Sequence, residues 1–463
     1  MENNDLFNVL DASKVGSFQK KLVTLASLGP FSDAFNEFGV SVSLVTVGIL
    51  FHLSAVFVAI LVASYWVGVA LGGILGGILS DLIGRRSIFV YDTIGMAAFA
   101  LISAVSFNGI FYFIARFLLG FFIGLDYAAA VPLVSEYAPA KERGKILSVE
   151  KVFFKIGGLV TIGLSLTLSV LVSKDLSWRI DFVAAAIVPI ILFFLRKDIP
   201  ESIRWAADTG NMHKVEDINK RLKKYGLEID ATTLPEGKKR TAKENIKEFF
   251  SKKNSRVVLY IFWISTGYAL TVNIASVYGT AIFTQLGASG TRALENTLIT
   301  AFFGLFGVIL MLFIVDKAGR RMTGTLGFLL TIVPSALFLV TYITGTINLN
   351  IAVIAIGLIF FINVGLIGTL MYIPSVEITS THLRGMTIGW DKLFAFGMAL
   401  PALTLYAYLG LRDAFLFVII ASLIFGIGTY FLTIDSTGKT LEQADWEYNL
   451  VSKNKLYKES EEK

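Results

Sequence analysis

Cysteine is absent from this chain of 463 residues, and histidine occurs only three times. Without cysteine the protein has no disulfide, no thiolate metal site and no cysteine nucleophile. The histidines, His52, His213 and His382, are scattered and lack the spacing of metal ligands. No nucleophile or cofactor motif is visible either. We therefore expect no enzyme activity, no metal site and no bound cofactor.

Charge is also scarce. Only 16% of the residues are charged and 55% are hydrophobic, whereas a soluble domain carries about 25% charged residues. This composition indicates a protein of the lipid bilayer. The net charge of +6 is typical of positive residues gathered on the cytoplasmic side, so we predict no binding to nucleic acid. The first 21 residues are polar and lack the apolar core of a signal peptide.

Long apolar runs fill most of the chain. A spanning helix needs about 20 mostly apolar residues. Twelve segments meet this requirement, near residues 20–49, 55–80, 88–106, 110–136, 145–172, 177–196, 257–285, 295–315, 322–343, 350–378, 384–409 and 412–433. An even number of spans places both termini on the same side of the membrane.

Positive residues gather on one side of these spans. The loops after the second, eighth and tenth segments and the stretch 197–256 carry them, while the opposite loops hold little beyond Lys174, Arg292 and Arg412. The positive-inside rule puts both termini in the cytoplasm, and we expect a multi-pass protein of the plasma membrane. The predicted organisation is a cytoplasmic segment 1–19, a bundle 20–196, a cytoplasmic linker with short helices 197–256, a bundle 257–433 and a cytoplasmic tail 434–463.

The linker shows helical patterning from Met212 to Tyr225, with polar residues on most faces. We expect it to be solvated and to lie along the lipid headgroups. A role in gating is the alternative.

Two charged motifs occur twice. The stretch from Asp81 to Arg86 is echoed from Asp316 to Arg321, and Glu136 to Arg143 is echoed by Glu377 to Arg384, each roughly half a chain length later. Two repeated halves in a membrane protein are typical of secondary transporters. Charge pairs at the inner ends of helices can hold the halves together in one state and separate in another. We predict a cytoplasmic gate made of Asp81, Arg85, Arg86, Glu136, Arg143, Asp316, Arg320, Arg321, Glu377 and Arg384.

Ionisable residues inside spans are costly and indicate function. The first segment holds Asp33 and Glu37, about 20–25 Å from its cytoplasmic end at 1.5 Å per residue. The fourth segment holds Arg116 at a comparable depth and Asp126 deeper. We expect Arg116 to pair with Asp33, because both charges can then be buried together. Asp33 would carry a proton when the pair opens, with Glu37 as a substitute; a purely structural role remains the alternative for Asp33 and Asp126.

A second group of charges lies in the fifth and eleventh segments. Lys151 and Lys155 are one helical turn apart, and Lys151 is close enough to the span end to snorkel. Lys155 and Lys392 lie deeper. These lysines either pair with the neighbouring Glu150 and Asp391 or form a cationic cavity for an acidic solute, and both possibilities stay open.

The seventh segment carries Trp263, Tyr268, Asn273 and Tyr278 on an otherwise apolar helix. Asparagine is costly in lipid and should face a cavity. Aromatic rings together with an amide suit a neutral polyol, by stacking and hydrogen bonding, although ordinary packing also explains single aromatic residues.

The motifs resemble those of the major facilitator superfamily and, more narrowly, of its sugar porter family. Gly77-x3-Asp81-x2-Gly84-Arg85-Arg86 is similar to the loop motif between helices two and three, with Leu82 where a basic residue is usual. Further matches are Arg116-x3-Gly120-x3-Gly124, Glu136 to Gly144, Trp178-Arg179, Pro200 to Trp205 and Asp435 to Glu442. The resemblance implies an all-α membrane protein with twelve transmembrane helices in two six-helix bundles and a solute site between them.

The resemblance also suggests solute contacts. Asn273 and Trp390 stand where sugar porters have a sugar-binding asparagine and tryptophan, and Tyr372 replaces another tryptophan. The paired glutamines of that family are replaced by Gly267 and Tyr268.

Other residues look like phosphate:proton symporters. Asp33 and Asp126 match aspartates that serve proton transfer there, and Tyr127 matches a tyrosine that touches phosphate. The helix-seven aspartate of those symporters is missing, with Gly267 at the corresponding spacing.

We therefore predict a proton-coupled symporter of a small polar metabolite, with sugar favoured. The alternatives are an organic-anion or phosphate:proton symporter, in which Lys155 and Lys392 face the anion, and an uncoupled sugar facilitator. The expected partners are the solute, protons and the lipid bilayer, and the expected state is a monomer. The candidate solute contacts are Asn36, Tyr127, Lys155, Trp263, Tyr268, Asn273, Tyr278, Tyr372, Trp390 and Lys392, and the candidate proton-coupling residues are Asp33, Glu37, Arg116 and Asp126.

Overall fold

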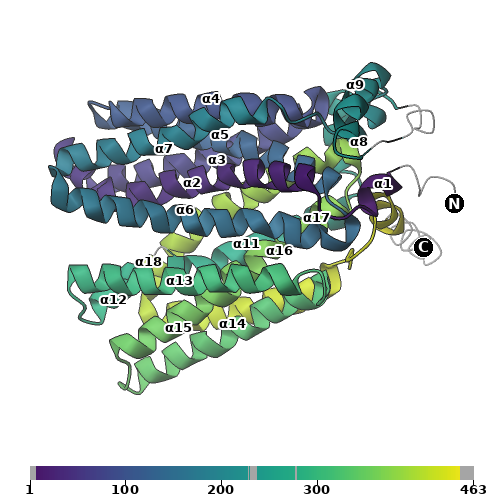
Figure 1. The fold of residues 1–463 in the computed structure, drawn as a ribbon. Helices are drawn as coiled ribbons and strands as arrows, with labels where there is room; N and C mark the ends of the chain where they lie inside the picture. Colours follow the sequence, from purple (N-terminus) through teal and green to yellow (C-terminus); the bar gives the residue numbers. More distant parts are fainter. Residues whose placement is uncertain (1–6, 228, 230–236, 277–278, 449–463) are drawn as a thin grey trace.

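The chain is almost entirely helical. The computed structural model describes residues 7–227, 229, 237–276 and 279–448, and these residues contain no strand. Figure 1 shows two groups of long helices side by side. The first group consists of α2 (Ser17–Leu50), α3 (Ala55–Ile83), α4 (Arg85–Ala104), α5 (Gly109–Tyr137), α6 (Arg143–Leu171) and α7 (Lys174–Arg196). The second consists of α11 (Ser255–Ser276), α12 (Gly279–Gln285), α13 (Gly290–Ile314), α14 (Arg320–Ile343), α15 (Leu349–Ile362) and α18 (Arg384–Leu432).

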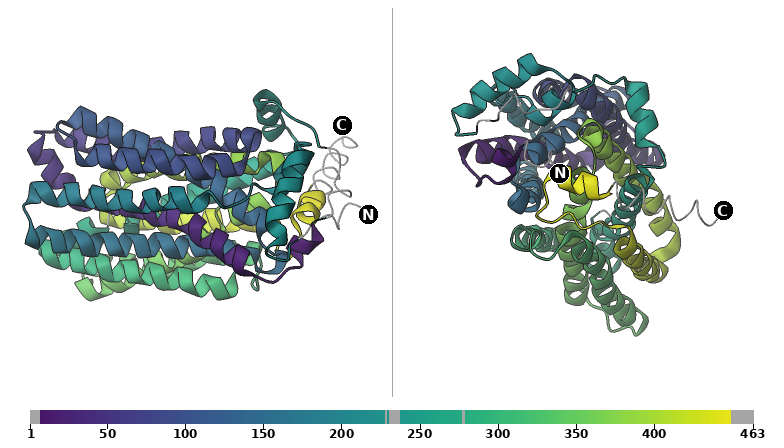
Figure 2. Two further views of the ribbon diagram at one scale, coloured as in Figure 1. Left: turned by 45° about the horizontal axis from the view of Figure 1, so that its top comes forward. Right: turned by 90° about the vertical axis from the view of Figure 1, so that its right-hand side faces the viewer.

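The two groups are the halves expected from the repeated motifs. They touch chiefly through α3 against α18 and α6 against α13. The short helices α1 (Asn8–Asp11), α8 (Ile203–Asp208) and α9 (Met212–Lys223) lie at one end of the bundle, where the described chain both starts and finishes (Figures 1 and 2). We call this the terminal end.

The helices that start at the opposite end have ordinary caps. Ser54, Asn108, Ser173, Ser289 and Asn348 each accept a hydrogen bond from a backbone N–H in the first turn of α3, α5, α7, α13 and α15. Such caps contribute about 1 kcal/mol each. Four of the long helices that start at the terminal end, α4, α6, α14 and α18, begin with an arginine and have no such cap.

Glycines allow α3 and α5 to approach closely. A Cβ on Gly72 would lie 1.9 Å from the carbonyl oxygen of Phe121, and one on Gly120 would lie 2.2 Å from that of Tyr65. Small residues at such crossings replace the hydrophobic driving force that lipid does not supply. This contact holds Tyr65 of α3 against α5, next to the site described below.

One predicted segment differs from the structure. The segments 384–409 and 412–433 are present as two helices within α18, which meet at Gly410, where φ is 67° and the backbone is not helical. The segment 350–378 is interrupted after α15 by a π-helical turn (Asn363–Ile367), then continues as α16 (Gly368–Leu370) and α17 (Ile373–Glu377). At the π turn, Gly365 lies against the backbone of Gly307 on α13, so tertiary packing explains a break that hydropathy does not reveal.

The linker is also more structured than predicted. Helix α9 buries Val215, Ile218 and Leu222, and α10 (Ala242–Phe249) buries Phe249. Phe249 stacks on Trp390 of α18, with ring centroids 6.3 Å apart. The linker therefore packs against the bundle, and the prediction of a solvated segment along the headgroups is wrong for these two helices.

Nine helices in the described part are long and apolar enough to cross a membrane. The long helices outside that set are α2, α6 and the first part of α18. These three carry most of the intramembrane charges that the sequence singled out, among them Asp33, Lys155 and Lys392, whereas Arg116 and Asp126 lie on α5.

Candidate functional site

A cavity of about 130 Å³ lies between the two halves. Its walls come from α2, α3, α5 and α6 on one side and from α11, α15 and α18 on the other. Helices of both halves therefore line one shared cavity. Six residues predicted to be functional line this central cavity, namely Glu37, Tyr127, Lys155, Tyr268, Asn273 and Lys392.

Lys155 is the most unusual residue of the cavity. Its side chain is buried, with 8% of the residue exposed. Its ammonium lies 4.6 Å from the ring centroid of Phe360 and 5.7 Å from that of Phe154. Among the described residues it forms no ion pair and no hydrogen bond, so the faces of these aromatic rings are the stabilising contacts next to its charge.

The other two lysines of the cavity have acidic neighbours. Lys392 lies 3.6 Å from the carboxylate of Asp391, and Lys151 lies 3.8 Å from that of Glu150. Lys151 lines the cavity, so the expectation that it snorkels to the membrane interface is wrong. Of the two possibilities left open by the sequence, pairing with a neighbouring acid therefore holds for Lys151 and Lys392. For Lys155, which has no such pair among the described residues, the cationic cavity stays open.

Asp33 lies next to the cavity and is fully buried. The hydroxyl of Tyr65 donates to one carboxylate oxygen, and the hydroxyl of Tyr127 donates to the other at 2.7 Å. Tyr127 also lines the cavity and lies under the ammonium of Lys392, 4.0 Å from ring centroid to nitrogen. A tyrosine thus connects the Asp33 carboxylate with the cavity.

The predicted ion pair between Asp33 and Arg116 is not formed. Arg116 donates to the backbone oxygen of Asn36 at 3.2 Å and lies over the rings of Tyr65 and Phe182, at 4.4 and 5.2 Å. The ring of Tyr65, which contacts both groups, therefore links the cation to the carboxylate. The prediction was wrong because equal depth on two helices does not determine which way each side chain points.

Asp126 has a strong partner that the sequence did not suggest. Arg196, at the end of α7, donates to its carboxylate at 2.5 Å and lies 3.5 Å from Asp92 of α4. Arg196 also donates to the backbone oxygens of Leu25 and Phe89, at 3.0 and 2.8 Å. It ties together α2, α4, α5 and α7, so Asp126 belongs to a buried ion cluster within the first half.

Replacing Arg196 with Met should strongly destabilise the protein. The change leaves two buried aspartates without a cation, and breaking such a pair costs about 3–5 kcal/mol. We expect a marked fall in the midpoint of thermal unfolding in detergent. Arg221→Met is a matched control, because Arg221 is half-exposed on α9 and, among the described residues, pairs with Asp217.

The double variant Arg196→Met with Asp126→Asn should regain part of that loss, since one unpaired charge is then removed. A double variant no more stable than the single one would show that Arg196 acts through its backbone contacts alone.

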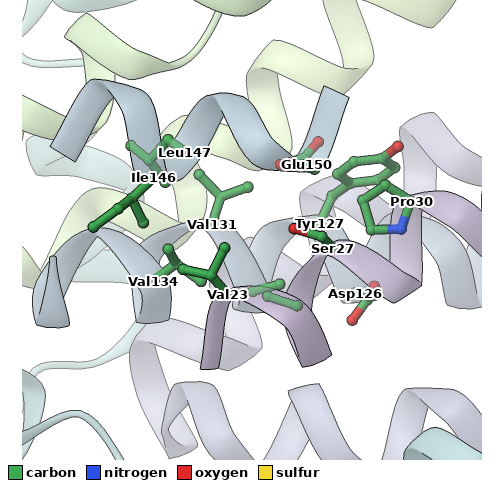
Figure 3. A pocket seen from close by; sticks show the side chains of 12 residues that line it. Val23, Ser27, Pro30, Asp126, Tyr127, Val131, Val134, Ile146, Leu147 and Glu150 are labelled. Atoms are coloured by element: carbon green, nitrogen blue, oxygen red, sulfur yellow. The ribbon is translucent and has the colours of Figure 1, made fainter. Parts of the chain in front are cut away.

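A second, smaller cavity lies on the terminal side of Tyr127, among α2, α5 and α6. Figure 3 shows Tyr127 and Glu150 at one side of it, with Asp126 below and Val134, Ile146 and Leu147 further along. Tyr127 lines both cavities. Its ring separates the central cavity from this smaller one.

Several predicted solute contacts do not line the central cavity. Trp263 donates to the backbone of Phe425 on α18, and Trp390 packs against Phe249 and Phe250. Tyr372 donates to Glu150 at 3.0 Å, and Asn36 donates to the backbone of its own helix. Tyr278 lies outside the described residues.

The cavity also contains residues that the sequence did not single out. Trp66, Phe38, Phe154, Phe360 and Phe396 give it aromatic walls. The chain has 38 phenylalanines, and nothing in their spacing separates those that face the cavity from those that face lipid. Lys155 gives a signal for Phe154 alone, because a residue one position from a buried lysine shares its depth.

The terminal end is closed by carboxylates that cap helices of the other half. The two oxygens of Asp81 accept from the backbone N–H groups of Gly385 and Met386, at 3.0 and 2.9 Å. Those of Asp316 accept from Gly144 and Lys145, at 3.0 and 2.7 Å. Negative groups are favoured at helix N-termini. Each aspartate therefore caps a helix of the opposite half: Asp81 caps α18, and Asp316 caps α6.

The same end contains a second pair of equivalent caps. Glu201 accepts from the backbone of Arg86 at 3.0 Å, and Asp435 accepts from that of Arg320 at 3.2 Å. All four helices that begin with an arginine are thus capped by a distant carboxylate. The stretches around Glu201 and Asp435 are therefore a third internal echo, in which an acidic residue is followed by a serine.

Ion pairs reinforce these caps unequally. Glu136 binds Arg85 of its own half at 3.3 Å and Arg384 of the other half at 3.2 Å. The equivalent Glu377 binds Arg320 at 2.9 Å, but Arg143 pairs instead with Asp11 of α1, at 2.7 Å. One of the two equivalent pairs therefore joins the halves, between Glu136 and Arg384. In the other, Asp11 of the N-terminal segment takes the place of Glu377 as the partner of Arg143.

Arg86 and Arg321 do not join the halves. Arg86 donates to the backbone oxygens of Lys197 and Ile199, and Arg321 donates to that of Thr433 at 3.0 Å. Each fixes the chain that leaves the last helix of its own half. Their position in the motif is thus explained by packing within each half.

Both chain ends meet at Arg204. It pairs with Asp11 at 2.6 Å and with Glu442 of the C-terminal segment. Burial alone would raise the pKa of Glu442, but the adjacent Arg204 guanidinium keeps it below its ordinary value. The contact is therefore ionised at neutral pH and holds α1, the linker and the C-terminal segment together.

Three comparisons place this geometry among known proteins. A family model described as "Sugar (and other) transporter" matches residues 17–448. The chain is similar to the niacin transporter NiaP of Acinetobacter baylyi (24% identity; 95% of this chain and 99% of the relative). It is also similar to the arabinose-proton symporter of Bacillus subtilis (24% identity; 75% and 76%). Among solved structures, the proton:xylose symporter XylE has the same fold, with a TM-score of 0.79, 19% identity and coverage of 93% of this chain and 99% of that chain.

Proposed function

Since the chain belongs to the sugar (and other) transporter family, we propose that it is a proton-coupled symporter that carries a small metabolite by alternating access. Membership of the family makes it a multi-pass membrane transporter with the major facilitator fold. Proton coupling, the solute and the roles of single residues are the proposal.

The observation that carries the proposal is the contact between Asp33 and Tyr127. A buried carboxylate is stable when it is hydrogen-bonded or protonated. The Tyr127 hydroxyl stabilises the charged form, and the ring of the same residue forms part of the cavity wall. A solute that displaces Tyr127 would weaken that hydrogen bond and favour protonation of Asp33. Solute binding and proton binding would then support each other.

Alternating access requires that the two ends open in turn. The capping contacts of Asp81 and Asp316 and the pair between Glu136 and Arg384 hold the halves together at the terminal end. We place this end in the cytoplasm because the positive loops lie there. Each contact contributes little when exposed to water, but several broken together shift a two-state balance by the few kcal/mol that matter.

The family allows more than one solute. The relatives and the solved structure are named for arabinose, xylose and niacin. A sugar is the solute that the sequence and the family name favour. Asn273 and Tyr268 are the residues of the cavity that would donate hydrogen bonds to it. We propose further that the protein works as a monomer in the plasma membrane.

The test is proton movement driven by the solute. Protein in vesicles of equal internal and external pH should move protons inward when its solute is added outside, because the two bind together. A pH-sensitive dye inside the vesicles would report a fall in pH with each solute of a panel of sugars, organic acids and phosphate. Vesicles without protein are the control. Counterflow of labelled solute with no accompanying proton signal would support an uncoupled facilitator instead.

A further inference from the structure

The central cavity is poorly furnished for a sugar. A sugar site needs several neutral donors and acceptors, because each buried hydroxyl must find a partner. Among the residues that line the cavity, the neutral polar groups are those of Trp66, Tyr127, Tyr268 and Asn273. Tyr127 already donates to Asp33, and the amide of Asn273 donates to the backbone oxygen of Ala269 at 2.6 Å. Few groups are left to bind a ring of hydroxyls.

The same cavity has an excess of positive charge. It is lined by three lysines and one carboxylate, that of Glu37. Lys151 and Lys392 have the acidic partners described above, whereas Lys155 has none within ion-pair distance among the described residues. A buried ammonium without a carboxylate is costly. An anionic group on the solute would supply the missing partner at Lys155.

The surroundings of Lys155 are aromatic. Phe154 and Phe360 lie beneath its ammonium, and the ring of Phe38 lies 6.3 Å from that of Phe154. Trp66 lines the same space. Rings at such distances bind a further planar ring by stacking or edge-to-face contact. The aromatic residues come from both halves, so a ring bound among them would touch both.

Size points the same way. The cavity measures about 130 Å³, and an apolar cavity of about 150 Å³ holds one benzene molecule. One six-membered ring with a single small substituent fits this space.

We infer that the solute is a small aromatic monocarboxylate, whose carboxylate binds Lys155 and whose ring lies among Trp66, Phe154 and Phe360. This inference rests on the proposed transport function and replaces a sugar with a different substrate class. Glu37 gives a reason for coupling, because its negative charge in the same cavity repels the solute until a proton neutralises it. The solute and the proton thus enter as a neutral pair.

The experiment is counterflow of benzoate into vesicles that contain the full-length protein. Benzamide, D-xylose, myo-inositol and inorganic phosphate are tested as competitors. We expect excess unlabelled benzoate to compete at least about 10-fold better than benzamide, which has the same ring without the charge, because hydrogen bonds to charged groups are about twice as strong as neutral ones. The sugars and phosphate should not compete.

Lys155→Gln should reduce benzoate counterflow by about 10-fold to 100-fold, the loss expected for one charged hydrogen bond. Lys155→Arg should keep most of it, because it keeps the charge. Lys220→Gln, at an exposed position of α9, is the matched control and should transport normally. The thermal unfolding midpoint of each variant shows whether it is folded.

The outcomes separate the two proposals. Counterflow of a sugar without benzoate, equal competition by benzamide, competition by phosphate, or an unaffected Lys155→Gln variant would overturn the inference and leave the transport function standing. Quenching of tryptophan fluorescence by benzoate, lost in Trp66→Phe, without any counterflow would support the ligand class and overturn the transport function.

Discussion

Replacing Asp33 with Asn should abolish uphill transport while leaving exchange intact. The variant keeps the size of the side chain but cannot take up or release a proton. An inward gradient of about 2 pH units supplies about 2.7 kcal/mol, which supports about 100-fold accumulation of solute at one proton per cycle. We expect the accumulation ratio to fall to about 1, measured as labelled solute inside vesicles under that gradient.

Counterflow by the same variant should continue, because exchange of solute across the membrane needs no net movement of protons. Asp217→Asn is the control, since Asp217 is exposed on α9 and, within the part of the chain that the structure describes, pairs with Arg221. Accumulation that persists in Asp33→Asn, with an unchanged dependence on pH, would exclude Asp33 as the proton carrier. Glu37, which lines the cavity directly, would then be the carboxylate to test.

The contacts around Asp33 suit a carboxylate that takes up and releases a proton. Both tyrosine hydroxyls donate to it, so the carboxylate is stabilised in its charged form without any cation at ion-pair distance among the described residues. A cation would fix the charge more firmly. Two neutral donors leave the balance between the charged and protonated forms open to small changes in the cavity.

The sequence identified Asp33, Glu37 and Lys155 because a charge within an apolar run is visible at a single position. It failed on their partners. Arg116 and Asp33 lie at equal depth, yet the direction of each side chain depends on how the helices rotate when they pack. Arg196 is the last residue of its predicted span. Nothing in the order of residues shows that this end of α7 lies against Asp126 and Asp92.

The repeated motifs were informative for a different reason. Asp81 and Asp316 were expected to form charge pairs, and they pair with Arg85 and Arg320 of their own motifs, at 3.1 and 2.9 Å. They also cap α18 and α6 of the opposite half. The repeat placed them at corresponding positions, while the type of contact depends on the ends of helices that come from the other half. The twelve helices, including the separation at Gly410, follow from hydropathy, whereas the break at Asn363–Ile367 depends on tertiary packing.

Two glycines bring the halves close together at the terminal end. A Cβ on Gly77 of α3 would lie 2.4 Å from the carbonyl oxygen of Gly385 and 2.8 Å from the Cα of Met386, both on α18. These are backbone atoms, which cannot move aside without moving the helix. Closure of this end therefore requires that position 77 has no side chain.

Gly77→Ala should accordingly hold the terminal end open. Overpacking of this kind costs about 1–3 kcal/mol, which shifts the balance between closed and open forms by about 5-fold to 150-fold. Because the chain has no cysteine, one introduced by Ala395→Cys, in the cavity wall, is the only thiol. We expect it to react with a membrane-impermeant reagent applied at the terminal end at least about 10-fold faster when Gly77→Ala is also present.

Gly163→Ala is the matched control for this prediction. A Cβ at Gly163 of α6 meets nothing within 4 Å, so the same methyl group is added without a contact. Alanine stabilises a helix relative to glycine by up to about 1 kcal/mol, and this gain is common to both variants. A difference in labelling between them therefore reports the contact with α18. Equal labelling would mean that the helices already separate at Gly77, and closure would then depend on the caps at Asp81 and Asp316 alone.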